Sequence, residues 1–482
     1  MTPDDRDELE TDYLVVGAGA AGMGFVDALI EGSDADVIMV DRRPAPGGHW
    51  LDAYPFVQLH QPSANYGVAS TPLGHDRVDQ DGPNRGFLEL AAGSEVCGYF
   101  DGVMRHRLLP SGQVRFFPMS EYLGDRRFRS LLTGQASEVT VRKRVVDATY
   151  LASKVPATEP PPFEVAEGAR CVPVGELAHL EDTPAGYVII GGGKTAMDAC
   201  TWLLEQGTPP DAITWIRPRD GWLMNRAYFQ PGSFSIGTFE GVVHDLEAVA
   251  ASDTVEEAFD RLEEAGVMLR LDPDIRPTMA KGPTLSIAER DGLRRIENVV
   301  RLGHVRRIER DRIELAEGSI PTSPAHVHVH CAAAGIAIRP PLPIFDEDRI
   351  TLQCISRMSP SLSAGVIGFI ESTDRSTEEK NRLLPPNPYS DTPFDFLRAI
   401  LIGLSNEMQW AGEPDLQAWV DDNRLNVLKD LGSSDDAGEL AEVQGRFLEA
   451  IFPALEKLRE LAKDATPAEQ ERMFDPAAAE HA

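Results

Sequence analysis

The chain has 482 residues, of which 42% are apolar and 26% charged, the balance of a globular protein with a sizeable core. This composition excludes a collagen-like, low-complexity or mainly disordered chain. Asp and Glu outnumber Lys and Arg by 77 to 46, which gives a net charge of −31. Nucleic acids and anionic membrane surfaces would repel such a chain, so neither is expected as a partner.

The five cysteines are scattered along the chain and form no CxxC pair. This pattern disfavours a disulfide scaffold, a zinc ribbon and a redox-active dithiol. The first ten residues are acidic and polar, unlike a signal peptide, and no apolar run is long enough to cross a bilayer. We therefore expect a cytoplasmic protein.

The N-terminal region has the pattern of a strand–helix–strand unit. A continuous apolar strand is expected over residues 13–16, a helix up to residue 30 and a second strand over 36–40. Three glycines follow the first strand at the spacing of a dinucleotide-binding turn: Gly17, Gly19 and Gly22. Such glycines permit a tight turn, close approach of the backbone to a pyrophosphate and close helix packing. Asp41 at the end of the second strand is placed to accept hydrogen bonds from an adenosine ribose.

A second unit of the same kind begins 174 residues later. Strands are expected over 187–190 and 212–216, with a helix through residue 204 between them. Its turn carries Gly191, Gly193 and Ala196 at the fingerprint positions, and alanine is an accepted third residue. Here the second strand ends in Arg217 and Arg219 rather than in an acid. Guanidinium groups suit a 2′-phosphate, so this unit is expected to prefer NADPH over NADH.

The rest of the chain has fewer signals. A proline-rich stretch over 154–165 is expected to cross between domains. Further expected elements are a helix over 254–265, a strand over 267–271, a hairpin over 299–316, a strand through the HVHVH run, and mostly helix over 394–461. His326, His328 and His330 alternate and share one face of that strand. Without a suitably spaced carboxylate or cysteine they favour a polar sheet face over a metal site.

The residues after the first unit resemble those of the two-dinucleotide-domain flavoproteins, and more narrowly the flavin-containing monooxygenases. The resemblance is carried by the acid-basic-x-x-x-GG-x-W run from Asp41 to Trp50, by Tyr54-Pro55, and by Pro62-Ser63-x-x-Tyr66. It covers roughly residues 10–370. The chain departs from the family in two places, because it lacks the Baeyer–Villiger signature FxGxxxHxxxW and the C-terminal GD motif of disulfide reductases.

The resemblance implies an α/β fold with two Rossmann-like domains and a helical C-terminal segment. A discontinuous FAD domain would comprise residues 1–155 and 326–482, and an NAD(P)H domain over 156–325 would be inserted between its parts. FAD is expected to contact the following residues: Gly17, Gly19, Ala20, Ala21, Gly22, Asp41, Arg42, Gly48, His49, Trp50, Ser63 and Tyr66. NADPH is expected to contact the following residues: Gly191, Gly193, Lys194, Thr195, Ala196, Arg217 and Arg219. His60, Gln61 and Asn65 are the expected catalytic-site residues beside the flavin ring.

The function implied is that of a monooxygenase. NADPH would reduce FAD, oxygen would add to form a flavin hydroperoxide, and one oxygen atom would pass to a small organic substrate. Two alternatives stay open: an FAD/NAD(P)H oxidoreductase without oxygen insertion, and a non-catalytic nucleotide-binding sensor. Molecular oxygen and a small molecule are the expected partners, with neither nucleic acid nor membrane and no metal, and a homodimer is expected from the family alone.

Overall fold

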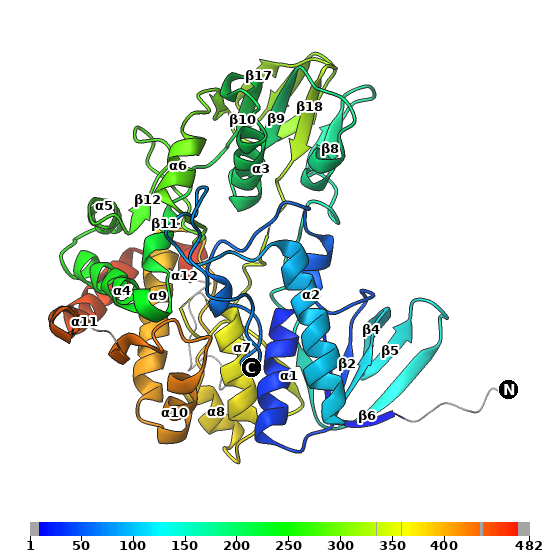
Figure 1. Ribbon diagram of the computed structural model, residues 1–482, viewed down its shortest axis with the longest axis vertical. Coiled ribbons are helices and arrows are strands. Elements are labelled where there is room, and N and C mark those ends of the chain that lie inside the picture. The colour runs from blue at the N-terminus through cyan, green and yellow to red at the C-terminus, as the bar shows by residue number, and fades with distance from the viewer. Residues whose placement is uncertain (1–8, 334, 358, 434–436, 471–482) are drawn as a thin grey trace.

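The first of two parallel sheets organises the N-terminal part of the computed structural model, which describes residues 9–333, 335–357, 359–433 and 437–470 (Figure 1). Its strands are β1 (Leu9–Val16), β2 (Val37–Val40), β3 (Val114–Phe117), β4 (Ser120–Gly124), β5 (Arg127–Ser130), β6 (Ala136–Asp147) and β19 (Arg349–Thr351). The path runs β3-β2-β1-β6-β5-β4, and β19 also pairs with β6. Along this path β3, β2, β1 and β6 are parallel to one another, and β19 is parallel to β6. Strands β4 and β5 form an antiparallel ribbon with β6.

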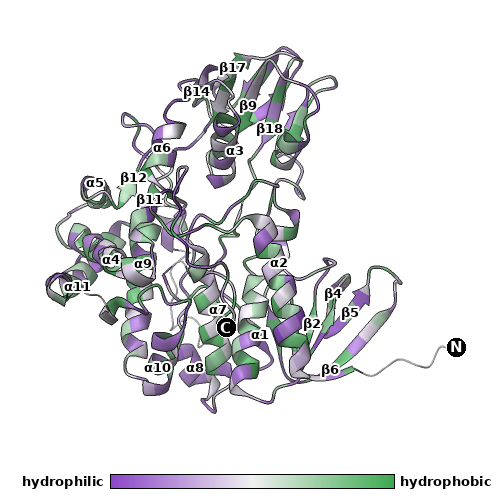
Figure 2. Cartoon of the chain, viewed as in Figure 1, coloured by the Kyte–Doolittle hydropathy of each residue, from purple (hydrophilic) through white to green (hydrophobic). Residues whose placement is uncertain are grey.

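Alternation along β1 sends side chains to two different cores. Tyr13 and Val15 pack with the helices that cover one face, whereas Leu14 packs with β6 and the antiparallel ribbon on the other. The covering helices are α1 (Ala20–Gly32), α2 (Gly93–Val103) and α7 (Pro360–Glu371). Figure 2 shows that α1 and α7 are rich in apolar residues, as helices buried between a sheet and other elements must be. The strand–helix–strand unit predicted from the sequence is confirmed.

The second parallel sheet has the order β14-β10-β9-β18-β8. Its strands are β8 (Cys171–Pro173), β9 (Gly186–Ile190), β10 (Ile213–Ile216), β14 (Val299–Val300) and β18 (His326–His330). One face carries α3 (Lys194–Glu205) and α6 (Ile287–Leu293). The other is covered by a small sheet of β7 (Glu164–Val165), β15 (Val305–Ile308), β16 (Arg312–Leu315) and β17 (Gly318–Pro321). The predicted α/β class with two Rossmann-like domains is confirmed.

Two details differ from the sequence-based expectations. The expected hairpin over 299–316 is formed by β15 and β16 alone, because Val299 and Val300 pair with β10 in the parallel sheet. Strand β18 pairs with β9, so the second sheet continues five residues past the expected boundary at residue 325. Its valines, Val327 and Val329, lie fully buried in the core of that sheet.

A third, helical core joins the middle of the chain to its C-terminal part. Helices α4 (Ser235–Ala250) and α5 (Val255–Glu264) pack against α9 (Pro393–Trp410) and α11 (Ala437–Leu461). Helix α10 (Pro414–Asp422) lies against α7 and contributes to the core of the first domain. The C-terminal helices therefore cover both the first domain and the helices of the inserted segment. The other strands and α-helices of the described residues are β11 (Leu223–Asn225), β12 (Met268–Leu269), β13 (Thr284–Leu285), α8 (Thr377–Leu383) and α12 (Pro467–Gln470).

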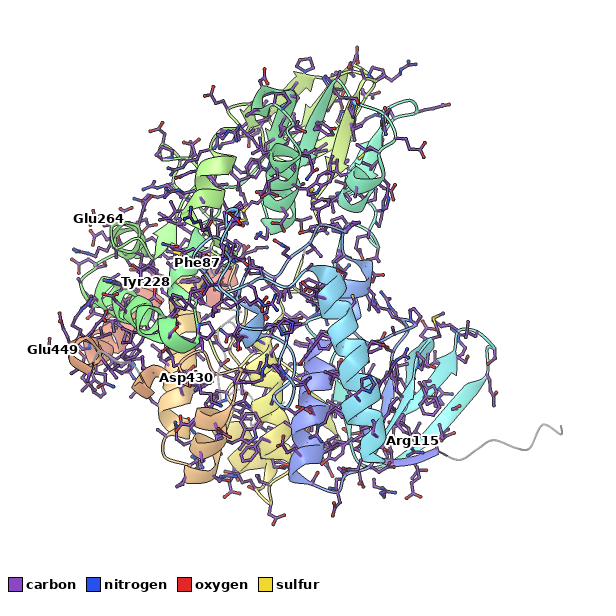
Figure 3. All side chains as sticks on the ribbon, viewed as in Figure 1. Phe87, Arg115, Tyr228, Glu264, Asp430 and Glu449 are labelled. Carbon is purple, nitrogen blue, oxygen red and sulfur yellow. The ribbon has the colours of Figure 1, made fainter. Side chains whose placement is uncertain are left out.

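The irregular segment between β2 and α2 connects the first domain to the inserted one. The amide of Leu88 donates to Gln230 Oε1 at 2.9 Å, and Arg226 Nη1 donates to Asn84 Oδ1 at 3.0 Å. Figure 3 shows Phe87 and Tyr228 in this junction, whereas Arg115 lies at the far end of the first sheet. The contacts fix this segment of the first domain against the 3-10 turn and the loop that follow β11 in the inserted segment.

Candidate functional site

The first glycine turn has the geometry of a phosphate-binding loop. Gly17 has φ of 105°, a conformation that favours glycine, and a Cβ on Gly22 would lie 2.0 Å from the Gly17 carbonyl oxygen. Helix α1 begins with Ala20 and Ala21 after an N-cap glycine, Gly19, without a side-chain cap. The amides of the first turn are therefore free of a capping side chain and are suited to a phosphate group.

Asp41 lies at the carboxyl end of β2, beside this turn. The side chain is 6% exposed, and its two oxygens accept hydrogen bonds from the Ala18 amide at 2.7 Å and the Arg43 amide at 2.8 Å. These bonds orient the carboxylate and leave it lone pairs for ribose hydroxyl groups. The neighbouring Arg42 side chain is exposed.

The glycine pair of the next loop packs directly on the turn. Gly48 has φ of 60°, and a Cβ there would lie 3.0 Å from the Gly19 Cα atom. This loop leads into the short 3-10 helix η1 (Gly48–Asp52), which places His49 and Trp50. Their rings stack with centroids 5.3 Å apart, and burial lowers the pKa of His49 to about 4. The His49 ring is therefore neutral near pH 7.

Tyr66 and Ser63 are both engaged by protein groups. Trp50 Nε1 donates to the Tyr66 hydroxyl oxygen at 2.6 Å, which joins the two ends of the loop. Ser63 is buried, donates to the Glu89 carbonyl at 3.0 Å and accepts from the Ala91 amide at 2.8 Å. The Ser63 hydroxyl thus stabilises the loop that carries the other predicted residues.

The second glycine turn repeats this geometry. Gly191 has φ of 143°, and a Cβ there would lie 2.9 Å from the Cys331 carbonyl oxygen. Helix α3 follows an N-cap glycine, Gly193, again without a side-chain cap. A Cβ on Gly193 would have no heavy atom within 4 Å, so this position is open to a ligand. Ala196 is fully buried in the core behind the turn, and Thr195 belongs to the first turn of the helix.

A segment of the first domain is anchored on α3. The Tyr54 hydroxyl donates to Asp198 Oδ2 at 2.5 Å, and Lys194 forms an ion pair with the other oxygen of the same carboxylate. The Phe56 ring stacks on Trp202 with centroids 4.6 Å apart and planes 14° apart. Burial and the Asp198 carboxylate raise the pKa of Tyr54, so this phenol stays protonated as a donor. The predicted phosphate-side residue Lys194 is therefore paired, within α3, with the carboxylate that accepts the hydrogen bond from the first domain.

The structure places the two predicted arginines in different surroundings. Arg217 is 3% exposed, pairs with Asp220 at 2.9 Å and lies over the Trp215 ring at 4.7 Å. Arg219 is about two-fifths exposed, and its Nη2 donates to the Thr278 carbonyl at 3.1 Å. Arg219 is thus the more accessible of the two for an added phosphate.

His60 joins the predicted flavin-side loop to β13. Its Nδ1 accepts a hydrogen bond from the Thr284 amide at 3.3 Å, so the proton of the neutral ring lies on Nε2. The Thr284 hydroxyl bonds to the His60 carbonyl, and burial lowers the pKa of His60 to about 3. The His60 ring is therefore neutral near pH 7, and His60 is not among the described residues that line the neighbouring cavity.

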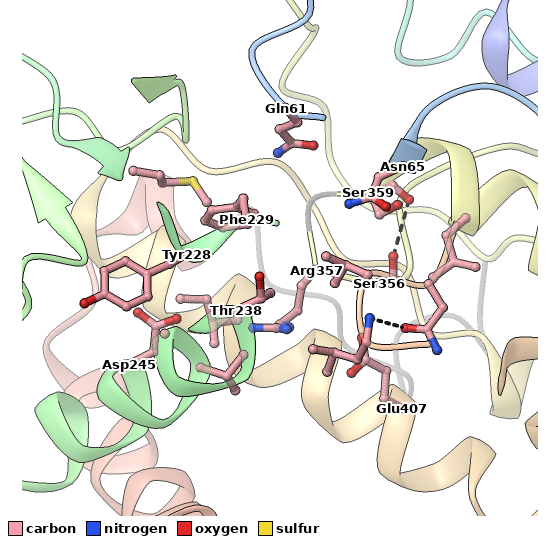
Figure 4. Close-up of a pocket in the computed structure, with 18 of the residues that line it drawn as sticks. Gln61, Asn65, Tyr228, Phe229, Thr238, Asp245, Ser356, Arg357, Ser359 and Glu407 are labelled. Carbon is pink, nitrogen blue, oxygen red and sulfur yellow. Dashed lines mark hydrogen bonds between the residues drawn. The ribbon is translucent and has the colours of Figure 1, made fainter. Parts of the chain in front are cut away.

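Gln61 and Asn65, by contrast, face a cavity (Figure 4). The space in it that the centre of a water molecule can occupy is about 80 Å³. The Asn65 Oδ1 atom is buried and without a hydrogen-bond partner among the described residues. Apolar side chains form much of the wall: Met224, Phe229, Val242, Val267, Met268, Leu362, Phe396, Ile400, Leu425, Val427 and Leu428. An unsatisfied amide oxygen in such a cavity is suited to accept a hydrogen bond from a bound ligand.

Three charged residues that the sequence analysis did not select also line this cavity: Asp245, Arg357 and Glu407. Asp245 comes from α4, Glu407 from α9, and Arg357 from the loop between β19 and α7. Figure 4 shows their side chains around one space. No local motif marks any of them, because each lies in a different segment and the segments meet only in the fold.

The described residues also bear on metal and thiol chemistry. They contain no group of three or more His, Cys, Asp or Glu side chains arranged for a metal ion. His328 is instead hydrogen-bonded to Thr322 Oγ1 and to the Arg170 carbonyl, each at 2.8 Å. All five cysteines are free thiols. No helix in the described ranges combines the length and apolar character needed to cross a bilayer.

Comparison with known proteins gives a family. No protein-family model matches the chain. The uncharacterized protein Rv2000 of Mycobacterium tuberculosis is 48% identical over 424 residues, which cover 88% of this chain and 79% of that protein. The uncharacterized protein Mb2023 of Mycobacterium bovis matches to the same extent. The chain belongs to the family of these mycobacterial proteins.

Solved structures show a more distant likeness, which concerns the fold alone. A steroid monooxygenase bound to NADP is 12% identical, with a TM-score of 0.48, and the match covers 92% of this chain and 98% of that one. The closed form of a cyclohexanone monooxygenase is 15% identical, with a TM-score of 0.46 and the same coverage. A bacillithiol disulfide reductase of Staphylococcus aureus is 11% identical, with a TM-score of 0.44, over 76% of this chain and 97% of that one.

Proposed function

We propose that the protein is an FAD-dependent, NADPH-using monooxygenase that transfers one oxygen atom to a small organic substrate. The observation that carries the proposal is the repeated glycine turn. Both α1 and α3 begin after a glycine with no side-chain cap, each at a parallel sheet, and the Tyr54 hydroxyl of the first domain donates to Asp198 of α3. Two dinucleotides bound at such turns would bring their reactive rings toward the junction, as hydride transfer requires.

The residues around the first turn fit FAD. The open amides of α1 would hold its pyrophosphate, and Asp41 would accept hydrogen bonds from its ribose. At the second turn the amides of α3 would hold the NADPH pyrophosphate, with Arg219 paired to the 2′-phosphate. In this proposal residues 1–155 and 326–482 bind FAD and residues 156–325 bind NADPH, apart from β18, which belongs to the second sheet.

The chain itself positions the reactants and excludes water. FAD supplies the redox chemistry when bound, namely acceptance of a hydride and activation of oxygen. Gln61 and Asn65 face the cavity from the flavin-side loop, and Asn65 Oδ1 is available to orient a bound group. The apolar wall reduces access of water to that space. His60 keeps the loop in register with β13 through Thr284.

The test begins with purified protein. We expect bound FAD and bleaching of its visible absorption by NADPH under nitrogen. Turnover under ¹⁸O₂ should then give a product that carries one heavy oxygen atom, with the other oxygen atom released as water. Bleaching with release of peroxide alone, and no labelled product across a substrate panel, would contradict oxygen insertion and favour an oxidoreductase. Protein that binds neither nucleotide would contradict the whole proposal.

A further inference from the structure

An acidic residue of the C-terminal part pairs with Arg219. Asp391, which precedes α9, has its Oδ2 atom 3.4 Å from Arg219 Nη1 and its Oδ1 atom 3.3 Å from Lys281 Nζ. One carboxylate thus bridges two cationic side chains that both belong to the inserted segment. These three residues, Arg219, Lys281 and Asp391, form what we call the bridging cluster.

The bridging cluster adjoins the second glycine turn. Within that turn a Cβ on Gly192 would lie 2.7 Å from the Arg219 carbonyl oxygen. The Arg219 guanidinium is held by Thr278, whose carbonyl accepts from Nη2 at 3.1 Å, and Lys281 follows on the same loop. Residues just after the second strand of a Rossmann unit lie near the adenosine ribose. A 2′-substituent on that ribose would therefore approach this cluster.

The cluster is accessible to a ligand. The side chains of Arg219, Lys281 and Asp391 are 38%, 45% and 24% exposed, whereas the side chain of Arg217 is only 4% exposed. In the described ranges of the chain, no second carboxylate is in ion-pair contact with Arg219 or Lys281. Asp391 is therefore the direct competitor of an anion that enters here.

The main chain around Asp391 is held independently of its carboxylate. The Ala280 amide donates to the Asp391 carbonyl at 2.9 Å, and the Ser390 hydroxyl donates to the Ala280 carbonyl. The Asp391 amide donates to Asp395 Oδ2 at 3.2 Å. Partly exposed ion pairs add little to stability, so the two segments should stay docked when the Asp391 charge is removed.

The carboxylate opposes the binding of a phosphate at this place. Guanidinium and ammonium groups are the side chains that phosphate oxygens prefer, but here both already have an anionic partner. An incoming phosphate must either displace the Asp391 carboxylate from Arg219 and Lys281 or bind beside a like charge, and both weaken binding. A coenzyme without a 2′-phosphate meets neither penalty.

We propose that Asp391 is a specificity-determining residue of the coenzyme site, which holds Arg219 and Lys281 as a resident counter-ion and thereby weakens the binding of a ribose 2′-phosphate. The inference rests on the proposed function in assigning the second turn to NADPH. It gives Lys281 a role beside Arg219. It also makes coenzyme preference depend on a residue of the C-terminal part, outside the segment that carries the glycine turn.

The experiment measures the contribution of the 2′-phosphate directly. Two adenosine probes, 2′,5′-ADP and 5′-AMP, differ only in that group, and calorimetry gives their dissociation constants for the full-length protein without turnover. The ratio of the two constants is the 2′-phosphate preference. In the original protein the 2′-phosphate should improve binding by at least about threefold.

Variants assign the effect to the cluster. Asp391→Asn keeps the shape of the side chain, removes its charge and should raise the 2′-phosphate preference about fivefold. Lys281→Gln should lower it about fivefold, a second test should the first variant fail to fold. The matched control is Asp182→Asn, because Asp182 pairs with Arg170 at 2.7 Å near the β8 edge of the second sheet and its loss changes the net charge equally. This control should stay within about twofold of the original preference.

The outcomes separate the inference from the proposed function. An unchanged preference in folded Asp391→Asn, or an equal rise in Asp182→Asn, would overturn the role of Asp391. If the original protein prefers 2′,5′-ADP over 5′-AMP, the assignment of the second turn to NADPH stands whatever the variants show. If the original protein and Asp391→Asn both bind neither probe, the assignment to NADPH and the inference fail together.

Discussion

At the scale of single residues, the two glycine turns need backbone conformations and close approaches that only glycine tolerates well. Gly17 and Gly191 adopt positive φ values, and Gly22 has no room for a Cβ. These demands follow from the backbone of a tight turn, so the spacing predicts them without knowledge of the rest of the fold. The partners of charged side chains are harder to predict from sequence. Arg217, for example, forms a buried ion pair with Asp220.

A matched pair of glycine variants separates the two nucleotides. A Cβ on Gly19 would meet no atom closer than 3.4 Å, and one on Gly193 none within 4 Å, so alanine at either position is compatible with folding. Gly19→Ala should lose FAD, since the methyl group occupies the space beside the pyrophosphate. Gly193→Ala should retain FAD and bind NADPH at least about tenfold more weakly. The measurements are the flavin spectrum after gel filtration and a titration with NADPH.

A third glycine variant serves as the control for folding. Gly22→Ala would place Cβ 2.0 Å from the Gly17 carbonyl oxygen and should disturb folding itself, which circular dichroism would detect. If Gly19→Ala folds and keeps FAD fully, the assignment of the first turn to FAD is wrong. If Gly193→Ala also lost FAD while remaining folded, the division between the two turns would fail.

Arg219 gives a test of coenzyme preference. Arg219→Ala should raise the Michaelis constant for NADPH by about tenfold and change that for NADH less than twofold, since only NADPH carries the 2′-phosphate. Arg219→Lys, which keeps the charge, should recover part of the loss. Initial rates of flavin reduction at varied coenzyme concentration provide the measurement. Equal effects on both coenzymes would rule out the phosphate contact.

At the scale of elements, patterns that depend on local periodicity were predicted well. The expected helix over 254–265 is α5, and its N-cap threonine, Thr254, accepts a hydrogen bond from the Glu257 amide. The expected hairpin was wrong in its first strand, because Val299 and Val300 pair with β10 and not with β15. A segment of only two apolar residues can pair with either sheet, and the tertiary fold decides which pairing forms.

The packing of residues 54–56 on α3 is expected to affect the rate of flavin reduction by NADPH. Phe56→Ala should slow flavin reduction by NADPH by about tenfold while FAD stays bound, because the stack on Trp202 holds α3 beside the first domain. Trp202→Phe preserves an aromatic stack and should remain within about twofold of the original rate. Stopped-flow absorbance under nitrogen measures both. An unchanged rate in Phe56→Ala would show that the stack does not position the coenzyme.

At the scale of the whole molecule, the cavity is assembled from segments that no sequence pattern connects. Gln61 and Asn65 were predicted from the resemblance, whereas Asp245, Arg357 and Glu407 come from helices and a loop whose sequences read as ordinary core or surface. Helix α4 belongs to the inserted segment and α9 to the C-terminal part, and their packing in one helical core brings the charges together. The fold class follows from local units, but the content of the cavity follows from how these units dock.

The burial of Asp245 in this cavity lowers the stability of the folded protein by an amount that depends on pH. Burial raises the pKa of Asp245 to about 7 in the folded protein, well above the ordinary value of about 4 that applies when the chain is unfolded. Between these values the folded state holds a proton that the unfolded state has lost. The stability that this proton gives is therefore complete below pH 4 and is lost as the pH rises to about 7.

Asp245→Asn removes this titration. At pH 8 we expect the free energy of unfolding of the variant to exceed that of the original protein by up to about 4 kcal/mol, so that the variant melts at a higher temperature. At pH 4 the two proteins should melt at nearly the same temperature. Glu407 and Arg357 face the same space and remain in both proteins, so the difference between the two melting profiles reports Asp245. Differential scanning calorimetry from pH 4 to pH 8 makes the comparison. A stability difference that is constant with pH would mean that Asp245 is solvated and ionised like an ordinary surface carboxylate, and that the cavity carries no unpaired buried charge.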